Sequence, residues 1–136
     1  MNNNKYDWII HYVFGEGDDY GLFADIHTHG LEKYNHPELV ITIALPQEIA
    51  GAILNNLGSR IVNGEKFDKD ELRMDIISNN LPVKIHKTYI NDKRVCVLIF
   101  PDQNSCLPFD DICEFPYNEQ YKYLEKIKER YENCAN

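Results

Sequence analysis

The chain has 136 residues, of which 43% are hydrophobic and 12% aromatic, and it carries a net charge of −8. This composition is not that of a disordered chain, and the length predicts a single domain over residues 1–136. The acidic balance and the lack of a basic stripe argue against nucleic acid as a partner. No apolar run approaches the roughly 18 residues of a membrane span, so we expect a cytoplasmic protein without membrane contact.

Two strands are expected near the N-terminus. Residues 8–14 are rich in aromatic and β-branched side chains, and residues 20–29 follow them after a turn that contains Gly and Asp. The two strands should therefore form a hairpin. In the first strand, His11 shares a face with Ile9 and Val13, which predicts a partly buried packing residue rather than a ligand.

The middle of the chain predicts a central strand and a long helix. Residues 38–45 are almost entirely apolar after the first, which is typical of a strand buried on both faces. Residues 46–63 begin with a proline, have apolar side chains at helical spacing and end in an Asn-Gly pair. Leu54 and Leu57 lie on the apolar stripe and should face the sheet. Residues 65–81 fit either a strand or a short helix.

The C-terminal half predicts a second hairpin, a long loop and a final helix. Residues 82–90 alternate between apolar and polar side chains, and residues 94–100 return after a turn as a buried strand. His86 lies away from the apolar side of the first of these strands, at the expected surface. Residues 101–116 form the loop, and residues 117–131 form an amphipathic helix. The order of elements predicts an α+β fold: a mainly antiparallel sheet of five or six strands, with one long internal helix packed on it and a C-terminal helix.

The second strand carries most of the polar chemistry. If residues 22–29 are extended, alternate side chains share a face, so Asp25, His27 and His29 point one way while their apolar neighbours point into the core. Successive members of this row lie roughly 6–7 Å apart along the strand. A titratable row on one strand face is either a solvated surface or a site.

Three further residues are expected to join this row. His36 and Glu38 follow a short loop, and the next strand should bring them back to the same end of the sheet. Asp102 comes directly after a buried strand, where a side chain often enters a pocket. We therefore expect one depression around these residues, with the segment 101–110 at its edge.

The histidines suggest two kinds of chemistry. Histidines two apart on a strand can both bind one divalent metal (zinc, iron or manganese), so His27 and His29 are the predicted metal ligands. Such a metal with an open position would activate water for hydrolysis, whereas without metal a histidine beside a carboxylate is an acid–base pair. In the remaining alternative there is no site, and His36 only orders a loop. The available third ligands are Asp25, His36, Glu38 and Asp102.

Two functional hypotheses follow. The first is a binding or interaction module, immunity-like or ligand-sequestering, whose pocket lies around residues 25–29. The second is a small metal-dependent hydrolase that uses His27 and His29. The ligand or protein partner is open under both hypotheses, a homodimer is possible, and no cofactor is expected other than a possible divalent metal.

Several short motifs occur in a family-like order. His36-Pro37-Glu38-Leu39 leads into a strand, Leu45-Pro46-Gln47-Glu48 opens a helix, and Pro101-Asp102-Gln103-Asn104 follows the last strand. Over about residues 8–121 this order resembles the bacterial domain of unknown function family 4262. The resemblance implies a small α+β domain and no particular reaction. Where many members resemble Tyr-Thr-x-Gly-Leu, this chain has His27-Thr28-His29-Gly30-Leu31.

Overall fold

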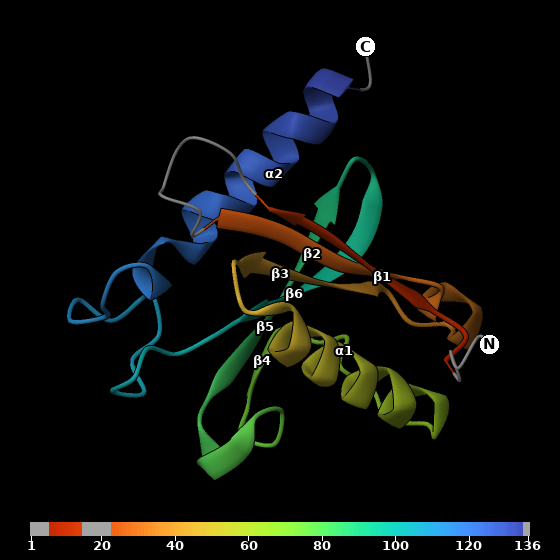
Figure 1. The fold of residues 1–136 in the computed structure, drawn as a ribbon, viewed down its shortest axis with the longest axis horizontal. Coiled ribbons are helices and arrows are strands. Elements are labelled where there is room, and N and C mark those ends of the chain that lie inside the picture. The colour runs from red at the N-terminus through yellow and green to blue at the C-terminus, as the bar shows by residue number, and fades with distance from the viewer. Residues whose placement is uncertain (1–5, 15–22, 135–136) are drawn as a thin grey trace.

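A six-stranded sheet with one helix on each face forms the body of the protein (Figure 1). The computed structural model describes residues 6–14 and 23–134. The turn predicted around residues 15–19 and the first residues of the second predicted strand therefore lie outside the described residues. The elements are β1 (Ile9–Phe14), β2 (Phe23–His29), β3 (Glu38–Ile43), α1 (Gln47–Val62), β4 (Glu71–Arg73), β5 (Val83–Ile90), β6 (Lys93–Ile99) and α2 (Gln120–Cys134).

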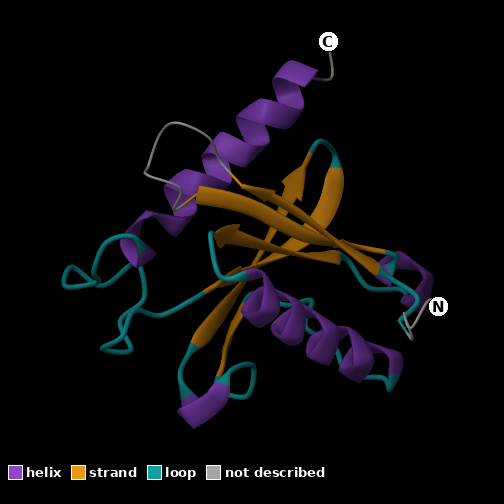
Figure 2. Cartoon of the chain, viewed as in Figure 1, coloured by secondary structure: helices purple, strands orange, loops and turns teal. Residues whose placement is uncertain are grey.

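The strands, drawn in orange in Figure 2, form one sheet with the order β1-β2-β3-β6-β5-β4. Neighbouring strands are antiparallel except β3 and β6, which run parallel at the centre. The chain leaves β3 through α1 and returns by the β4–β5–β6 meander, so β6 enters beside β3 in the same direction. The predicted α+β fold is confirmed, and the sheet is mixed, with one parallel pair among otherwise antiparallel neighbours.

The two central strands are buried on both faces. Every residue of β3 from Leu39 to Ile43 is buried, and so is every residue of β6 from Val95 to Ile99. The near-continuous apolar runs of these strands follow from this position, because both neighbouring layers exclude water from them. The sheet thus separates two apolar cores, one under α1 and one under α2.

The α1 core is built on the apolar stripe that the sequence predicted. Leu54 and Leu57 are fully buried, as expected for residues that face the sheet. Two glycines on this helix let β1 approach closely. A Cβ atom at Gly58 would lie 2.4 Å from Cζ2 of Trp8, and the indole nitrogen of Trp8 donates to Asn55 at 2.8 Å. The helix therefore determines where β1 lies.

The α2 core lies on the opposite face. Tyr123, Leu124 and Ile127 pack against apolar side chains of β2, β3 and β6. The helix starts where Gln120 pairs with the backbone of Phe100: its amide nitrogen donates to the carbonyl at 2.7 Å, and its oxygen accepts from the N–H at 2.8 Å. This contact joins the beginning of α2 to the end of β6. None of the helices among the described residues is long and apolar enough to cross a bilayer.

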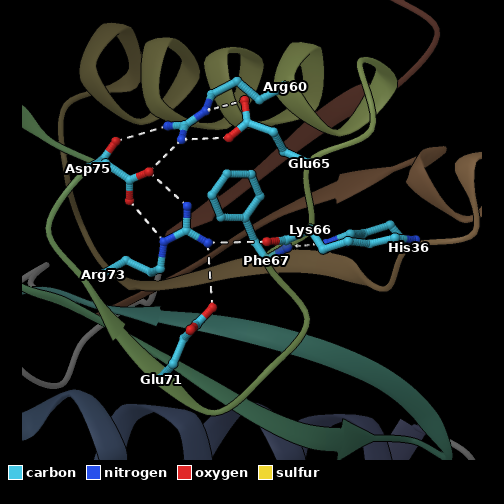
Figure 3. A network of polar contacts seen from close by, with 8 residues as sticks. All are labelled: His36, Arg60, Glu65, Lys66, Phe67, Glu71, Arg73 and Asp75. Carbon is cyan, nitrogen blue, oxygen red and sulfur yellow. Dashed lines mark hydrogen bonds and ion pairs between the residues drawn. The ribbon is translucent and has the colours of Figure 1, made fainter.

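The sequence did not decide whether the segment between α1 and β5 is a strand or a helix. In the structure a network of polar contacts holds this segment (Figure 3). The guanidinium groups of Arg60 and Arg73 lie over the Phe67 ring, 4.8 and 4.6 Å from its centroid. Both also contact the Asp75 carboxylate, at 2.6 and 2.7 Å. Their hydrogen bonds, chiefly from Arg73, hold the pKa of Asp75 well below its ordinary value. Side chains far apart in sequence thus place the short strand β4.

Replacing Leu54 with alanine tests the packing of α1. We expect Leu54→Ala to lower the free energy of unfolding by about 2–5 kcal/mol, because the lost side chain leaves a cavity against the sheet. Ile49→Ala is the control, since Ile49 is 50% exposed on the same helix and its loss should cost less than about 0.5 kcal/mol. Denaturant melts measure both, and equal losses would contradict the assigned face.

Candidate functional site

Asp25, His27 and His29 form a continuous row on the α2 face of β2, as their alternation predicted. Nδ1 of His27 lies 2.8 Å from Oδ1 of Asp25, and Nε2 of His27 lies 3.2 Å from Nε2 of His29. Asp25 is only 7% exposed, and Tyr131 from α2 donates to its second carboxylate oxygen at 3.1 Å. Because a carboxylate accepts hydrogen bonds, His27 carries a proton on Nδ1, and this orients its Nε2 toward His29.

His11 also belongs to this cluster, and the prediction that it is partly buried is wrong, because it is exposed. In the β1–β2 pair His11 lies directly opposite His27. Its ring stacks on His27, with centroids 5.2 Å apart, and meets His29 edge-on at 4.4 Å. The shared face with Ile9 and Val13 is correct, but these residues are 53% and 46% exposed. At the sheet edge this face is open to solvent, because β1 contacts α1 through its other face.

Glu38 ends the turn that follows His29. One of its oxygens accepts from the Thr28 hydroxyl at 2.7 Å and from the Leu31 N–H at 3.2 Å. The other accepts from the N–H groups of Gly30 and Glu32, at 3.0 and 3.3 Å. With four donors on one carboxylate, Glu38 acts first as the support of this turn. It also lines the pocket described below.

His36 does not join the cluster. It is buried, its Nδ1 donates to the Pro37 carbonyl at 2.8 Å, and its Nε2 accepts from the Phe67 N–H at 2.9 Å (Figure 3). Both ring nitrogens are therefore in use, and the ring is the neutral Nδ1–H tautomer. Burial lowers the pKa of His36. The expectation that His36 faces the histidine row is wrong, because its ring holds a distant backbone segment instead.

Asp102 also lies elsewhere. It follows the end of β6, whereas Glu38 pairs with Val95 at the beginning of that strand, so the two carboxylates are at opposite ends of the sheet. Asp102 accepts from the N–H groups of Cys106, Glu114 and Asn104, between 2.8 and 2.9 Å, and these hydrogen bonds lower its pKa. It organises its own loop, and the expected placement of the segment 101–110 at the edge of the site is wrong.

His86 is not at the open surface that the sequence predicted. Its ring meets the Tyr121 ring edge-on, with centroids 5.3 Å apart. Because α2 covers this face of β5, the side chain is half-buried, and burial lowers its pKa. The strand alternation was correct, and the helix that covers the strand was not visible in that pattern.

A pocket of about 230 Å³ lies beside the histidine row. Val40, Ile90 and Val95 give it an apolar floor, while Lys93 lies at the rim. The walls come from β2, β3, the β5–β6 hairpin and the end of α2. The polar lining residues are Asp25, His27, Thr28, His29, Glu32, Glu38, Asn91, Lys93 and Tyr131.

The charge of this lining is acidic. Three carboxylates (Asp25, Glu32 and Glu38) face one cation, Lys93. Burial and the positive charge that His27, His11 and Lys93 can carry lower the pKa of His29, while Glu38 opposes the shift. A neutral His29 presents a nitrogen lone pair at neutral pH, which suits a hydrogen-bond donor or a metal ion.

Comparison with known proteins identifies the family of this chain. The family model described as a domain of unknown function (DUF4262) matches residues 2–89, more than half of the chain. The chain belongs to this family. The match begins earlier and ends sooner than the expected 8–121, so it includes His11, β2 and Glu38 but not β6 or α2. Comparisons with curated proteins and with solved structures find no match.

Sequence reasoning missed several residues of the site in this family member. His11 was assigned to packing, and Lys93 and Tyr131 were not considered as lining residues. The sequence did contain a signal for His11, because an antiparallel hairpin must place some residue of the first strand opposite His27. The other two had none, since the position of the β5–β6 hairpin and of α2 depends on tertiary packing.

The role of His36 predicts a pH-dependent loss of stability in His36→Ala. The variant leaves the buried Phe67 N–H without an acceptor, which should cost about 1–3 kcal/mol at neutral pH. The pKa of His36 is lower in the folded state than its unfolded value of about 6.5, so its contribution is complete above that value and declines as the pH falls. The difference from wild type should narrow between about pH 7 and pH 5.

Urea melts across this pH range measure the difference. Lys69→Ala is the control, because Lys69 is exposed and its substitution should have an effect within about 0.5 kcal/mol at every pH. A difference that widens toward acid pH would contradict the neutral tautomer of His36.

Proposed function

We propose that this protein is a ligand-binding module that holds a small molecule in the pocket beside His27 and His29. The observation that carries the proposal is the pocket itself, in which an apolar floor meets a polar row. Binding pockets commonly combine apolar walls with a few polar groups that orient the ligand. In this pocket Val40, Ile90 and Val95 would hold an apolar body, and the histidines would contact a polar end.

The charges of the lining favour a ligand with a positive or hydrogen-bond-donating end. Asp25 already accepts from His27 and Tyr131, and Glu38 accepts from four donors. Glu32 is the exposed carboxylate of the lining, and it is the candidate partner of an ammonium group. The pocket volume limits the ligand to a small molecule, and ligand sequestration would fit such a chain.

The second candidate is a small metal-dependent hydrolase. It is favoured by the 2.8 Å pairing of His27 with Asp25 beside a pocket, since a carboxylate that orients a histidine is a usual feature of catalytic metal sites. This candidate requires a metal ion at the histidines. Its test is zinc-dependent hydrolysis of 4-nitrophenyl acetate, which should be lost in His27→Ala.

Two-dimensional NMR of labelled protein tests the binding proposal. Small amines, zwitterions and carboxylates, each with an apolar tail, are added in the presence of a chelator that removes metal ions. We expect amines or zwitterions to shift the amide signals of His27, Ile90 and Val95, because these residues line the pocket. Saturable shifts confined to the amides of the pocket would support the proposal.

A charge reversal at the rim provides the matched control. Glu32→Lys should weaken binding of the amines by about tenfold or more, which corresponds to about 1.4 kcal/mol. Glu129→Lys makes the same change at an exposed position of α2 outside the pocket and should leave binding unchanged. Shifts that occur elsewhere, or no saturable shifts at all, would contradict the proposed pocket.

A further inference from the structure

We infer that His11, His27 and His29 form a zinc-binding site at the edge of the sheet, with Asp25 as the residue that orients His27. This inference adds His11 as a ligand and does not rest on the proposed ligand-binding function. The three histidines come from two strands, and one nitrogen from each lies within 4.8 Å of the others.

The strand pairing explains why three imidazoles meet. His11 and His27 are partners across the β1–β2 ladder, and His29 follows two residues later on the same face. Cross-strand partners have Cβ atoms about 4.5–5.5 Å apart, so their side chains are within contact distance without a change of backbone. Two adjacent strands of a sheet provide a rigid base for such a ligand set.

The distance between two of the nitrogens fits one shared ion. Imidazole nitrogens that bind the same tetrahedral zinc ion at about 2.0–2.1 Å lie about 3.3 Å from each other. Nε2 of His27 and Nε2 of His29 are 3.2 Å apart. A zinc ion could contact both nitrogens with little movement of either ring. His11 is exposed, so its ring can turn toward the same ion.

Asp25 prepares His27 for this role. Its carboxylate accepts a hydrogen bond from Nδ1–H of His27, with 2.8 Å between nitrogen and oxygen, and this directs Nε2 toward His29. Histidines that bind metal ions commonly donate their other N–H to a carboxylate in this way. Tyr131 fixes Asp25 in turn through a hydrogen bond of 3.1 Å. The hydrogen bonds that Asp25 accepts from Tyr131 and from His27 therefore hold the His27 ring in the orientation of a metal ligand.

The donor set and its surroundings fit zinc better than the divalent ions that prefer oxygen ligands. Imidazole ligands suit zinc, as they suit copper, nickel and iron, whereas manganese and magnesium prefer oxygen ligands. The nearby acidic lining favours a cation over an anion. Three protein ligands leave a fourth position, and His27 and His29 both border the pocket, so this position would lie at the pocket edge.

Zinc titration of the full chain tests the site. We expect saturable uptake of one Zn²⁺ per chain, measured by competition with a chromophoric chelator. His11→Phe keeps a ring that can stack on His27 but removes the nitrogen ligands, and should weaken uptake by more than about 100-fold, beyond the usual effect of a supporting residue. Asp25→Asn should weaken uptake by about 10–100-fold.

Two control variants separate this site from other sources of zinc binding. His86→Phe keeps the ring contact with Tyr121 and lies outside the cluster, so its uptake should be unchanged. Cys106→Ser should also be unchanged, and the Co²⁺-loaded protein should lack the near-ultraviolet charge-transfer band of a thiolate ligand. Amide NMR spectra establish that each variant is folded.

Three results would overturn the inference: no saturable uptake in wild type, uptake that survives His11→Phe, or uptake that is lost in Cys106→Ser. Because His11 is an exposed residue of an edge strand, its variant should fold, which keeps the test decisive. Failure of the zinc site leaves the ligand-binding proposal intact, since the ligand screen is made in the presence of a chelator. Zinc uptake together with a negative ligand screen would support the zinc site and contradict the ligand-binding proposal.

Discussion

The carboxylate of Glu38 is the constraint on which the arrangement of the site depends. It lies at the start of β3 and gathers the Thr28 hydroxyl and three consecutive backbone N–H groups of the turn after β2. These donors would otherwise lack partners within a part-buried turn, which is costly. The turn also lies close to the residues just before β1, since a Cβ atom at Gly30 would lie 2.9 Å from the Asp7 carbonyl oxygen. One side chain thus ends β2 directly after His29.

The position of β1 depends on the helix on the other side of the sheet. Trp8 fits against Gly58 of α1, where any larger residue would collide with the indole, and Tyr12 makes a similar close approach to Gly51. Because Trp8, just before β1, and Tyr12 in β1 lie on the side that faces α1, His11 is left on the other face of the strand, opposite His27. The glycines of α1 therefore influence a polar cluster that the helix itself does not contact.

The two faces of the sheet have different chemistry because α1 and α2 cover them to different extents. Under α1 the core is apolar, and His36 is accepted there only as a neutral ring with both nitrogens bonded. Under α2 the cover is partial: it buries Asp25 and half-buries His86 while His11 and His29 remain exposed. Partial burial keeps the polar row accessible and still allows Asp25 and Tyr131 to orient it. A site requires both conditions, since a fully solvated row would not be oriented.

The sequence by itself determined the α+β class, the long helix α1 with Leu54 facing the sheet, and the common face of Asp25, His27 and His29. These features follow from local geometry, because side chains repeat every two residues in a strand and every 3.6 in a helix. Only the tertiary structure decided that His11 joins the row, since its partner depends on the register of the hairpin. It also decided that His36 and Asp102 stay apart, because each satisfies backbone N–H groups whose positions no local pattern contains. Periodicity specifies on which face of an element a side chain lies. Which other elements that face contacts depends on how all the elements together bury apolar surface and satisfy hydrogen bonds.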